Sequence, residues 1–145
     1  MRIALLGNPN TGKSSVFNML TGLRQHVGNF PGVTVDKKVG KISIHDETHE
    51  LIDFPGTYSV YPRSKDEEVV YKSLCDHQSD NYPDLALVVV DLSNLERNLL
   101  LFSQIYDLQI PCIMILNMAD IAKIQNKEFD LEALRQEFPE AALLK

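Results

Sequence analysis

The residues with the clearest chemistry form one run near the start of the chain, Gly7-Asn8-Pro9-Asn10-Thr11-Gly12-Lys13-Ser14. This run matches G-x-x-x-x-G-K-[ST], a loop whose backbone N–H groups surround the phosphates of a nucleotide. Its two glycines let the backbone approach phosphate oxygens that a Cβ would obstruct. Lys13 is expected to reach the β- and γ-phosphates, and the Ser14 hydroxyl is expected to bind Mg²⁺. The run predicts binding of a nucleoside triphosphate, and a glycine-containing turn without a ligand is the alternative.

The segments on either side of this run are those that a phosphate loop requires. Residues 3–6 are apolar and predict a strand, and Val16, Leu20 and Leu23 follow the run at helical spacing. The N-terminus of such a helix places a positive partial charge beside the phosphates. This strand–loop–helix context supports the interpretation of the run as a phosphate loop.

A second polar segment, Asp53-Phe54-Pro55-Gly56, follows a hairpin that is predicted over residues 36–53. An aspartate at the end of a strand can hold Mg²⁺, and the N–H of Gly56 can meet the γ-phosphate. An ordinary Asp-x-Pro-Gly turn would show the same pattern. Upstream, residues 23–35 have no clear period and predict a long loop, in which Thr34 is the candidate to complete the Mg²⁺ shell.

The third polar segment, Asn117-Met118-Ala119-Asp120, follows the apolar residues 113–116. An aspartate can accept hydrogen bonds from both N1–H and the exocyclic amine of guanine, whereas adenine would leave the carboxylate unsatisfied. Asn and Asp are also frequent in ordinary loops after strands, so the pattern is weak when it stands alone. Met118 would give the guanine ring an apolar neighbour. The segment predicts guanine as the base.

The order of the predicted elements defines the fold class. Further helices are predicted over residues 64–77, 93–106 and 130–139, with apparent capping boxes at 64–67 and 93–96, and further strands over 85–91, 113–116 and 141–144. Strands that alternate with helices predict a three-layer α/β fold with a mostly parallel sheet and one antiparallel edge hairpin. Together with the phosphate loop and the Asn-x-x-Asp segment, this order of elements resembles the Ras-like P-loop GTPase fold. Ligands of such sheets lie at the carboxyl ends of the strands, where the polar segments fall.

Composition narrows the class of protein. The chain has 145 residues, enough for one domain, and its net charge of −6 argues against a nucleic acid as the partner. Cys75 and Cys112 lack metal-ligand spacing and favour a reducing compartment, and the four histidines are expected to be solvated. No run approaches the ~20 apolar residues of a membrane span, and the first strand starts too near Met1 for a signal peptide, so a soluble chain is expected.

Taken together, the motifs resemble the N-terminal G domain of ferrous iron transport protein B, the FeoB family of bacterial iron transporters. The resemblance covers nearly the whole chain and is carried by five segments, namely residues 7–14, 27–35 (VGNFPGVTV), 53–59 (DFPGTYS), 91–98 (DLSNLERN) and 117–120. The second and fourth segments separate this family from other small GTPases.

The resemblance implies a GTPase switch that binds GTP or GDP with Mg²⁺, and hydrolysis that is stimulated by K⁺ held at Asn10. It also implies a place on the cytoplasmic face of the bacterial inner membrane, with the helical and transmembrane iron-transport regions of the same protein as partners. Residues 1–145 would then be a G domain that stops before the fifth guanine-contacting loop. A homo-oligomer is left open.

The motifs and the resemblance together assign the site residues. Lys13, Thr34 and Gly56 are expected to act in hydrolysis, and Ser14, Thr34 and Asp53 are expected to hold Mg²⁺. Residues expected to contact the nucleotide are Gly7, Asn8, Pro9, Asn10, Thr11, Gly12, Lys13, Ser14, Ser15, Gly32, Val33, Thr34, Val35, Asp53, Phe54, Pro55, Gly56, Asn117, Met118 and Asp120.

The reaction expected from these residues is slow hydrolysis. Thr57 occupies the position at which Ras-like enzymes carry a water-orienting glutamine, and a threonine is too short for that role. Two other functional classes fit the same motifs. One is a stand-alone GTPase of ribosome assembly or tRNA modification, and the other is a nucleotide-binding module without turnover.

Overall fold

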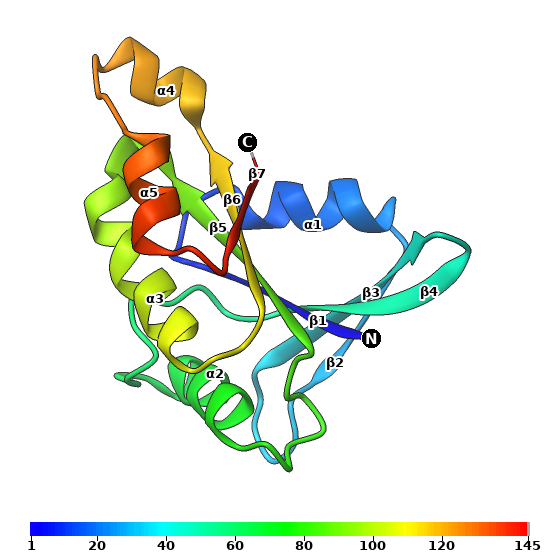
Figure 1. Cartoon of the computed structure of the whole chain (residues 1–145). Helices are drawn as coiled ribbons and strands as arrows, with labels where there is room; N and C mark the ends of the chain where they lie inside the picture. The colour runs from blue at the N-terminus through cyan, green and yellow to red at the C-terminus, as the bar shows by residue number, and fades with distance from the viewer. Residues whose placement is uncertain (145) are drawn as a thin grey trace.

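The computed structural model describes residues 1–144, which form one sheet with helices on both faces (Figure 1). The elements in chain order are β1 (Arg2–Gly7), α1 (Lys13–Thr21), β2 (Gln25–Asn29), β3 (Asp36–Ile44), β4 (Glu47–Asp53), α2 (Lys65–Cys75), β5 (Leu85–Asp91), a 3₁₀ turn η1 (Leu92–Asn94), α3 (Leu95–Asp107), β6 (Cys112–Asn117), α4 (Ala119–Ile124), α5 (Leu131–Glu137) and β7 (Ala142–Leu144).

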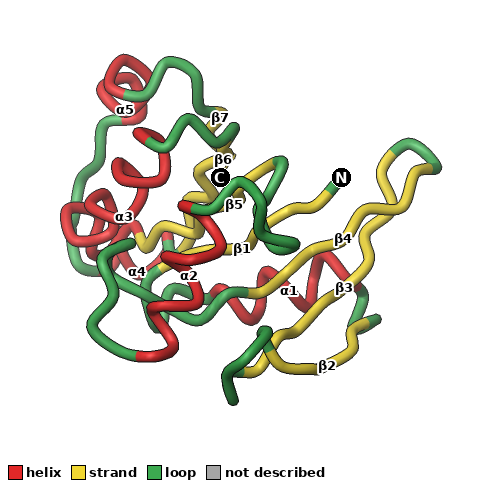
Figure 2. Tube along the Cα trace, turned by 90° about the horizontal axis from the view of Figure 1, so that it is seen from below, coloured by secondary structure: helices red, strands yellow, loops and turns green. Residues whose placement is uncertain are grey.

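The sheet has seven strands in the order β2-β3-β4-β1-β5-β6-β7. The pairs β4–β1, β1–β5, β5–β6 and β6–β7 are parallel, whereas β2–β3 and β3–β4 are antiparallel. The antiparallel part extends from the body of the molecule as a ribbon (Figure 2). The predicted α/β class, with a mostly parallel sheet and an antiparallel edge hairpin, is therefore confirmed.

The sheet separates two hydrophobic clusters. One face packs against α1 through residues such as Ile3, Leu5 and Phe17, and the other packs against α2, α3 and α5 through residues such as Leu74, Phe102 and Leu134. Burial of alternate residues of β1 and β5 on opposite faces follows from the two-residue period of a strand. The middle strands β1 and β5 are consequently apolar along most of their length.

Two elements were not expected from the sequence. Residues 25–29 form β2 through backbone pairing with β3. All five residues are exposed at the edge of the sheet, and for this reason the segment shows no hydrophobic period. Residues 119–124 form the short helix α4, which contains the last two residues of the Asn-x-x-Asp segment. Backbone hydrogen bonds, which leave no trace in side-chain periodicity, account for both differences.

The predicted helix caps are confirmed at two of three positions. Ser64 Oγ accepts a hydrogen bond from Glu67 N at 3.2 Å, and Asp130 Oδ1 accepts one from Ala133 N at 3.1 Å. The predicted capping box at residues 93–96 is wrong. Asp91 Oδ1 instead accepts hydrogen bonds from the backbone N–H and the hydroxyl of Ser93, at 2.8 and 2.6 Å, so the aspartate caps η1 before α3 begins.

Several remaining expectations concern single residues. Cys112 is buried in β6, and burial raises the pKa of both the Cys75 and the Cys112 thiols. His49 is 8% exposed, so the expectation that all four histidines are solvated is wrong for this one. Within residues 1–144, no helix is long and apolar enough to cross a bilayer, and no three His, Cys, Asp or Glu side chains come together as a metal site.

Candidate functional site

The predicted phosphate loop connects the end of β1 to the start of α1 in a conformation that needs glycine. Gly12 has a φ of +86°, in the left-handed region, and Asn10 shares that region with a φ of +63°. A Cβ on Gly7 would lie 2.9 Å from the Val89 carbonyl oxygen and 3.1 Å from Thr11 Oγ1. Thr11 Oγ1 donates a hydrogen bond to the Asn8 carbonyl oxygen at 3.0 Å, which closes the loop on itself.

Asn117, the last residue of β6, contacts the predicted phosphate loop. Asn117 Nδ2 donates a hydrogen bond to the Thr11 carbonyl oxygen at 2.8 Å, across 106 positions of sequence. The amide comes so close that a Cβ on Gly12 would overlap Asn117 Nδ2. Asn117 therefore supports the predicted phosphate loop, a contact that sequence reasoning had not assigned to it.

Lys13 and Asp53 form an ion pair, although the sequence suggested that each would face the nucleotide or its metal. The side chains are 12% and 10% exposed, and Lys13 Nζ contacts Asp53 Oδ1. The parallel register of β1 with β4 places Asp53 opposite Leu5, two residues before the loop begins. The pair brings a cation and a carboxylate from distant segments to the same end of the sheet.

Two adjoining cavities contain most of the predicted site residues, and Lys13 lines both. The first, about 520 Å³, is lined by Asn8, Pro9, Asn10, Gly12, Lys13, Ser14, Ser15 and Gly56. The second, about 330 Å³, is lined by Lys13, Thr34, Val35, Asp36, Lys38, Asp53, Phe54, Pro55 and Asp66. Thr34, Ser14 and Ser15 are exposed. The structure thus brings the phosphate loop, the Thr34 segment and the Asp53 segment together.

Gly56 lies directly against the phosphate loop. A Cβ at this position would come within 3.1 Å of both the N and Cα atoms of Pro9. The next residue is held by a backbone hydrogen bond from Thr57 N to the Gly7 carbonyl oxygen at 3.1 Å. A side chain at position 56 would press on the backbone of the loop, so this close approach favours glycine.

The Thr57 hydroxyl points into the protein. Thr57 is 1% exposed, and its Oγ1 lies 2.6 Å from both the Ser59 carbonyl oxygen and Glu67 Oε2. The sequence identified Thr57 as too short to orient a water molecule, and the structure adds that its hydroxyl is already occupied. Glu67 could have been noticed only as part of the capping box, which gives no hint of this contact.

Helix α3 holds the rest of the segment after Gly56. Gln104 Oε1 accepts hydrogen bonds from Ser59 Oγ at 3.0 Å and from Val60 N at 2.8 Å. The Arg97 guanidinium lies over the ring of Tyr58, 3.9 Å from its centroid, at a distance typical of cation–π contact. No sequence signal pointed to Gln104, because a glutamine on an amphipathic helix is unremarkable.

The predicted guanine-contacting residues lie beside the phosphate loop rather than inside the two cavities. Met118 has a φ of +60° and precedes α4, and its Cε would be 3.8 Å from a Cβ at Gly12. Asp120 is exposed in the first turn of α4. Of the other predicted residues, Gly7 and Thr11 shape the loop, while Gly32 and Val33 belong to the segment before Thr34 and line neither cavity.

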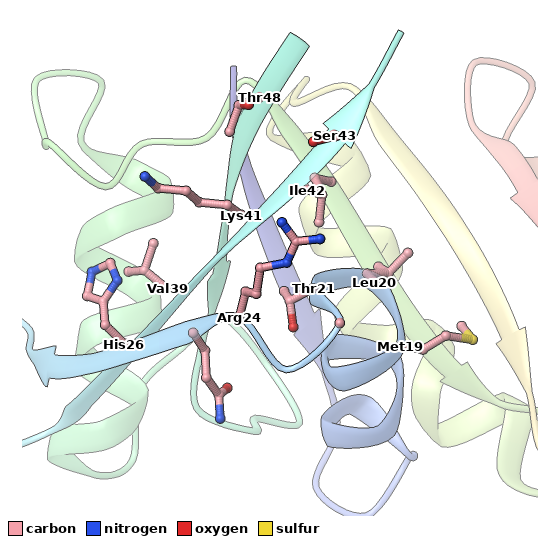
Figure 3. Close-up of a pocket in the computed structure, with 12 residues that line it drawn as sticks. Met19, Leu20, Thr21, Arg24, His26, Val39, Lys41, Ile42, Ser43 and Thr48 are labelled. Atoms are coloured by element: carbon pink, nitrogen blue, oxygen red, sulfur yellow. The ribbon is translucent and has the colours of Figure 1, made fainter. Parts of the chain in front are cut away.

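A further cavity of about 660 Å³ lies at the opposite end of α1 and contains none of the predicted site residues (Figure 3). Its charged side chains are cationic, but Lys41 extends away from the Arg24 guanidinium, so the positive charges do not converge on one point. Size alone therefore does not identify the functional site.

The sheet order and the three polar segments at its carboxyl edge define a P-loop domain of the G-domain class. Comparison with known proteins identifies the family. The family model for ferrous iron transport protein B matches residues 1–141. The chain belongs to this family, and it is a G domain of it.

The relatives include the Fe(2+) transporter FeoB of Shigella flexneri, which is 48% identical over 134 residues, and that of Salmonella typhimurium, which is 47% identical. These matches cover 92% of this chain but only 17% of each relative.

Solved structures of the family share the fold. A mutant of S. thermophilus NFeoB bound to GDP is 40% identical, with a TM-score of 0.86, and the match covers 99% of this chain and 54% of that one. The G domain of T. maritima FeoB is 36% identical, with a TM-score of 0.85, and the match covers 99% and 84%. The cytosolic domain of L. pneumophila FeoB is 38% identical, with a TM-score of 0.88 and coverage of 99% and 59%.

Proposed function

We propose that this chain binds GTP and hydrolyses it slowly, as the nucleotide-dependent switch of a ferrous iron transporter. The observation that carries the proposal is the convergence of Lys13, Thr34, Asp53 and Gly56 on two adjoining cavities at the phosphate loop. A relative of 40% identity is described as bound to GDP, which supports a guanine nucleotide as the ligand.

The residues present suit a magnesium ion. The Ser14 and Thr34 hydroxyls are exposed at the cavities, and Asp53 already lies against a cation in the form of Lys13. Hydroxyl and carboxylate oxygens are the ligands that Mg²⁺ takes beside nucleotide phosphates. When bound, the ion would neutralise charge on the β- and γ-phosphates. Asn10, in the left-handed region at the mouth of the loop, is the residue proposed to hold K⁺.

In the proposed reaction a water molecule attacks the γ-phosphate in line. Lys13 and the N–H groups of the phosphate loop and Gly56 stabilise the charge that develops on the phosphate oxygens. Thr57 does not orient this water, because its hydroxyl is bound to Ser59 and Glu67 inside the protein. Turnover is therefore slow, and K⁺ near Asn10 would add to the charge stabilisation that Lys13 and the N–H groups provide.

The switch consists of the two segments that a γ-phosphate would hold, around Thr34 and after Gly56. Loss of that phosphate on hydrolysis would release both. The chain spans only 17% of the length of its FeoB relatives, so coupling of this release to iron transport, through helical and membrane regions of a longer protein, is part of the proposal.

The guanine assignment is tested with Asp120→Asn. Replacing the carboxylate by an amide exchanges two acceptors for one acceptor and one donor, which suits xanthine instead of guanine. We expect the affinity for GTP to fall at least tenfold and the affinity for XTP to rise, in calorimetric titrations with Mg²⁺. Asp130→Asn, a matched change at an exposed helix cap, should leave both affinities unchanged. Equal GTP affinity in Asp120→Asn and the unmodified chain would remove the assignment.

The role of K⁺ is tested separately. We expect GTP hydrolysis to be faster in KCl than in NaCl at equal ionic strength, and we expect Asn10→Ala to abolish the difference while GDP still binds. Equal rates in the two salts would contradict a role for the cation. That result would not contradict the proposal that the chain binds GTP.

A further inference from the structure

A small cavity lies between the Thr34 segment and α2, outside the two cavities of the proposed nucleotide site. Its volume is about 160 Å³, and it is lined by Phe30, Pro31, Val33, Lys65, Glu68, Val69, Lys72, Ser73, Ser79 and Asn81. Three parts of the chain contribute: the segment before Thr34, helix α2, and the connection from α2 to β5. We call this cavity the switch–α2 pocket.

The size of the switch–α2 pocket restricts its occupant. Pockets for drug-sized ligands have volumes of about 300–1,000 Å³, whereas a cavity of about 150 Å³ is enough for one benzene ring. The apolar part of the lining comes from Phe30, Pro31, Val33 and Val69, and Phe30 is itself packed on Phe54 with ring centroids 5.4 Å apart. A single aromatic ring fits both the volume and this lining.

Asn81 adds a polar requirement. This residue is 4% exposed, and its side-chain oxygen is buried without a hydrogen-bond partner among residues 1–144. Its backbone N–H is satisfied by Ser79 Oγ at 3.1 Å, so the side-chain oxygen is what remains to be paired. A buried polar group without a partner is unfavourable, and a ligand that supplies the missing hydrogen bond would gain from it.

The rim of the pocket carries charge. Lys65 and Lys72 are exposed one above the other on α2 with Glu68 between them, and none of the three forms a salt bridge within the described part of the chain. The two lysines outnumber the one carboxylate at the rim. The excess positive charge favours an occupant with acidic neighbours.

We propose that the switch–α2 pocket binds a tyrosine side chain of a partner protein, in a segment where acidic residues flank the tyrosine. The ring occupies the apolar part of the pocket, the phenolic hydroxyl pairs with the Asn81 amide, and the flanking carboxylates face Lys65 and Lys72. Tyrosine combines a large apolar ring with a polar tip, which is the combination that this lining requires.

The test uses three capped tripeptides, Glu-Tyr-Glu, Glu-Phe-Glu and Gln-Tyr-Gln, titrated into the ¹⁵N-labelled chain and followed by chemical shifts of Val69, Ser73 and Asn81. Loss of the hydroxyl should weaken binding about five- to tenfold, as expected for one hydrogen bond. Loss of the two carboxylates should weaken it about threefold at low salt and less at high salt. Equal affinity of the Tyr and Phe peptides would overturn the role of Asn81.

Two variants locate the effect. Asn81→Ala removes the amide but breaks no side-chain hydrogen bond of the described structure, and it should abolish the preference for Tyr over Phe. Gln78→Ala, an exposed amide in the same connection that does not line the pocket, should keep the preference. If free p-cresol binds as tightly as Glu-Tyr-Glu, the pocket takes a free phenol and the assignment to a partner protein is wrong.

A second expectation rests on the proposed function. Val33 directly precedes Thr34 and Pro31 lies three positions before it, so a nucleotide that reorders Thr34 would also reshape the pocket. The Glu-Tyr-Glu affinity should then differ at least threefold between chain loaded with GDP and chain loaded with a non-hydrolysable GTP analogue, and the peptide should change nucleotide affinity by the same factor. Equal affinities would refute this coupling, whereas tyrosine binding itself is decided by the tripeptide series without nucleotide.

Discussion

The contact between Gly12 and Asn117 leads to a quantitative prediction for Gly12→Ala. The substitution has two costs. A residue with a Cβ in the left-handed region is disfavoured by about 1–2 kcal/mol, and Gly12 has a φ of +86°. The new Cβ would also overlap Asn117 Nδ2 and displace the amide from the Thr11 carbonyl, which costs about 1 kcal/mol for the lost hydrogen bond. Together these costs lower the free energy of unfolding by about 2–3 kcal/mol.

The expected change is large enough to measure. The entropy of unfolding of a 145-residue chain is about 0.3 kcal/mol/K near Tm, so Gly12→Ala should lower Tm by about 7–10 °C. Urea unfolding should show a lower midpoint with an unchanged slope. Both measurements need nucleotide-free protein, because a ligand that binds only the folded state would add its own stabilisation.

Substitutions at two other glycines separate the backbone cost from the cost of displacing Asn117. Gly22 has a φ of +60°, and a Cβ there would meet nothing within 4 Å, so Gly22→Ala should cost only the backbone term. Gly28 is equally open and outside the left-handed region, so Gly28→Ala should leave stability within about 0.5 kcal/mol.

The double variant tests the contact directly. Asn117→Ala alone should cost about 1 kcal/mol, and once it is made, Gly12→Ala has no amide left to displace. The double variant should therefore be about 1 kcal/mol more stable than the sum of the single effects predicts. If the effects are additive, or if Gly12→Ala costs no more than Gly22→Ala, the claim that Asn117 holds the phosphate loop is refuted.

Three further predictions concern other parts of the molecule. Gly40→Ala should destabilise the chain by about 2 kcal/mol in urea unfolding, because the new Cβ would overlap the buried Thr21 side chain between β3 and α1. Ser64→Ala should lower stability by about 1 kcal/mol through loss of the α2 cap, and Ser64→Asp should restore it. Iodoacetamide should modify Cys75 but not the buried Cys112 until the chain is unfolded, as counted by mass spectrometry. Because burial raises the pKa of Cys75, its labelling at pH 8 should be slower than that of a free thiol of ordinary pKa.

The sequence predicted structure best in segments where the residue types and the spacing of apolar residues indicate the same element. The phosphate loop between an apolar strand and an amphipathic helix, the hairpin around His45 and Asp46, and the buried run of β5 each follow from residue types within a short window. The α/β class could be predicted for the same reason, since strands and helices alternate with clear periods. The turn at His45 and Asp46 has both residues in the left-handed region, with φ of 51° and 65°.

The features that could not be predicted from the sequence are contacts between segments that are distant in the chain. The Lys13–Asp53 pair spans 40 positions and the Asn117–Thr11 hydrogen bond spans 106, and neither has a local pattern. The strand β2 was missed because it is exposed along its whole length, and the burial of His49 was missed because it follows from register in β4. The predicted roles of the site residues in hydrolysis remain predictions until the nucleotide experiments are done.

The pairing of β2 with β3 turns the Thr34 segment into the closed end of a hairpin. Asn29 lies opposite Asp36, and Phe30 N donates a hydrogen bond to the Val35 carbonyl oxygen at 3.0 Å, so only residues 31–34 lie beyond the last rung. A loop of four residues anchored at both ends has little reach. A large displacement of Thr34 would therefore require the backbone hydrogen bonds between β2 and β3 to break in order, beginning with the pair nearest the turn. Amide exchange along β2 would then record how far each nucleotide opens it.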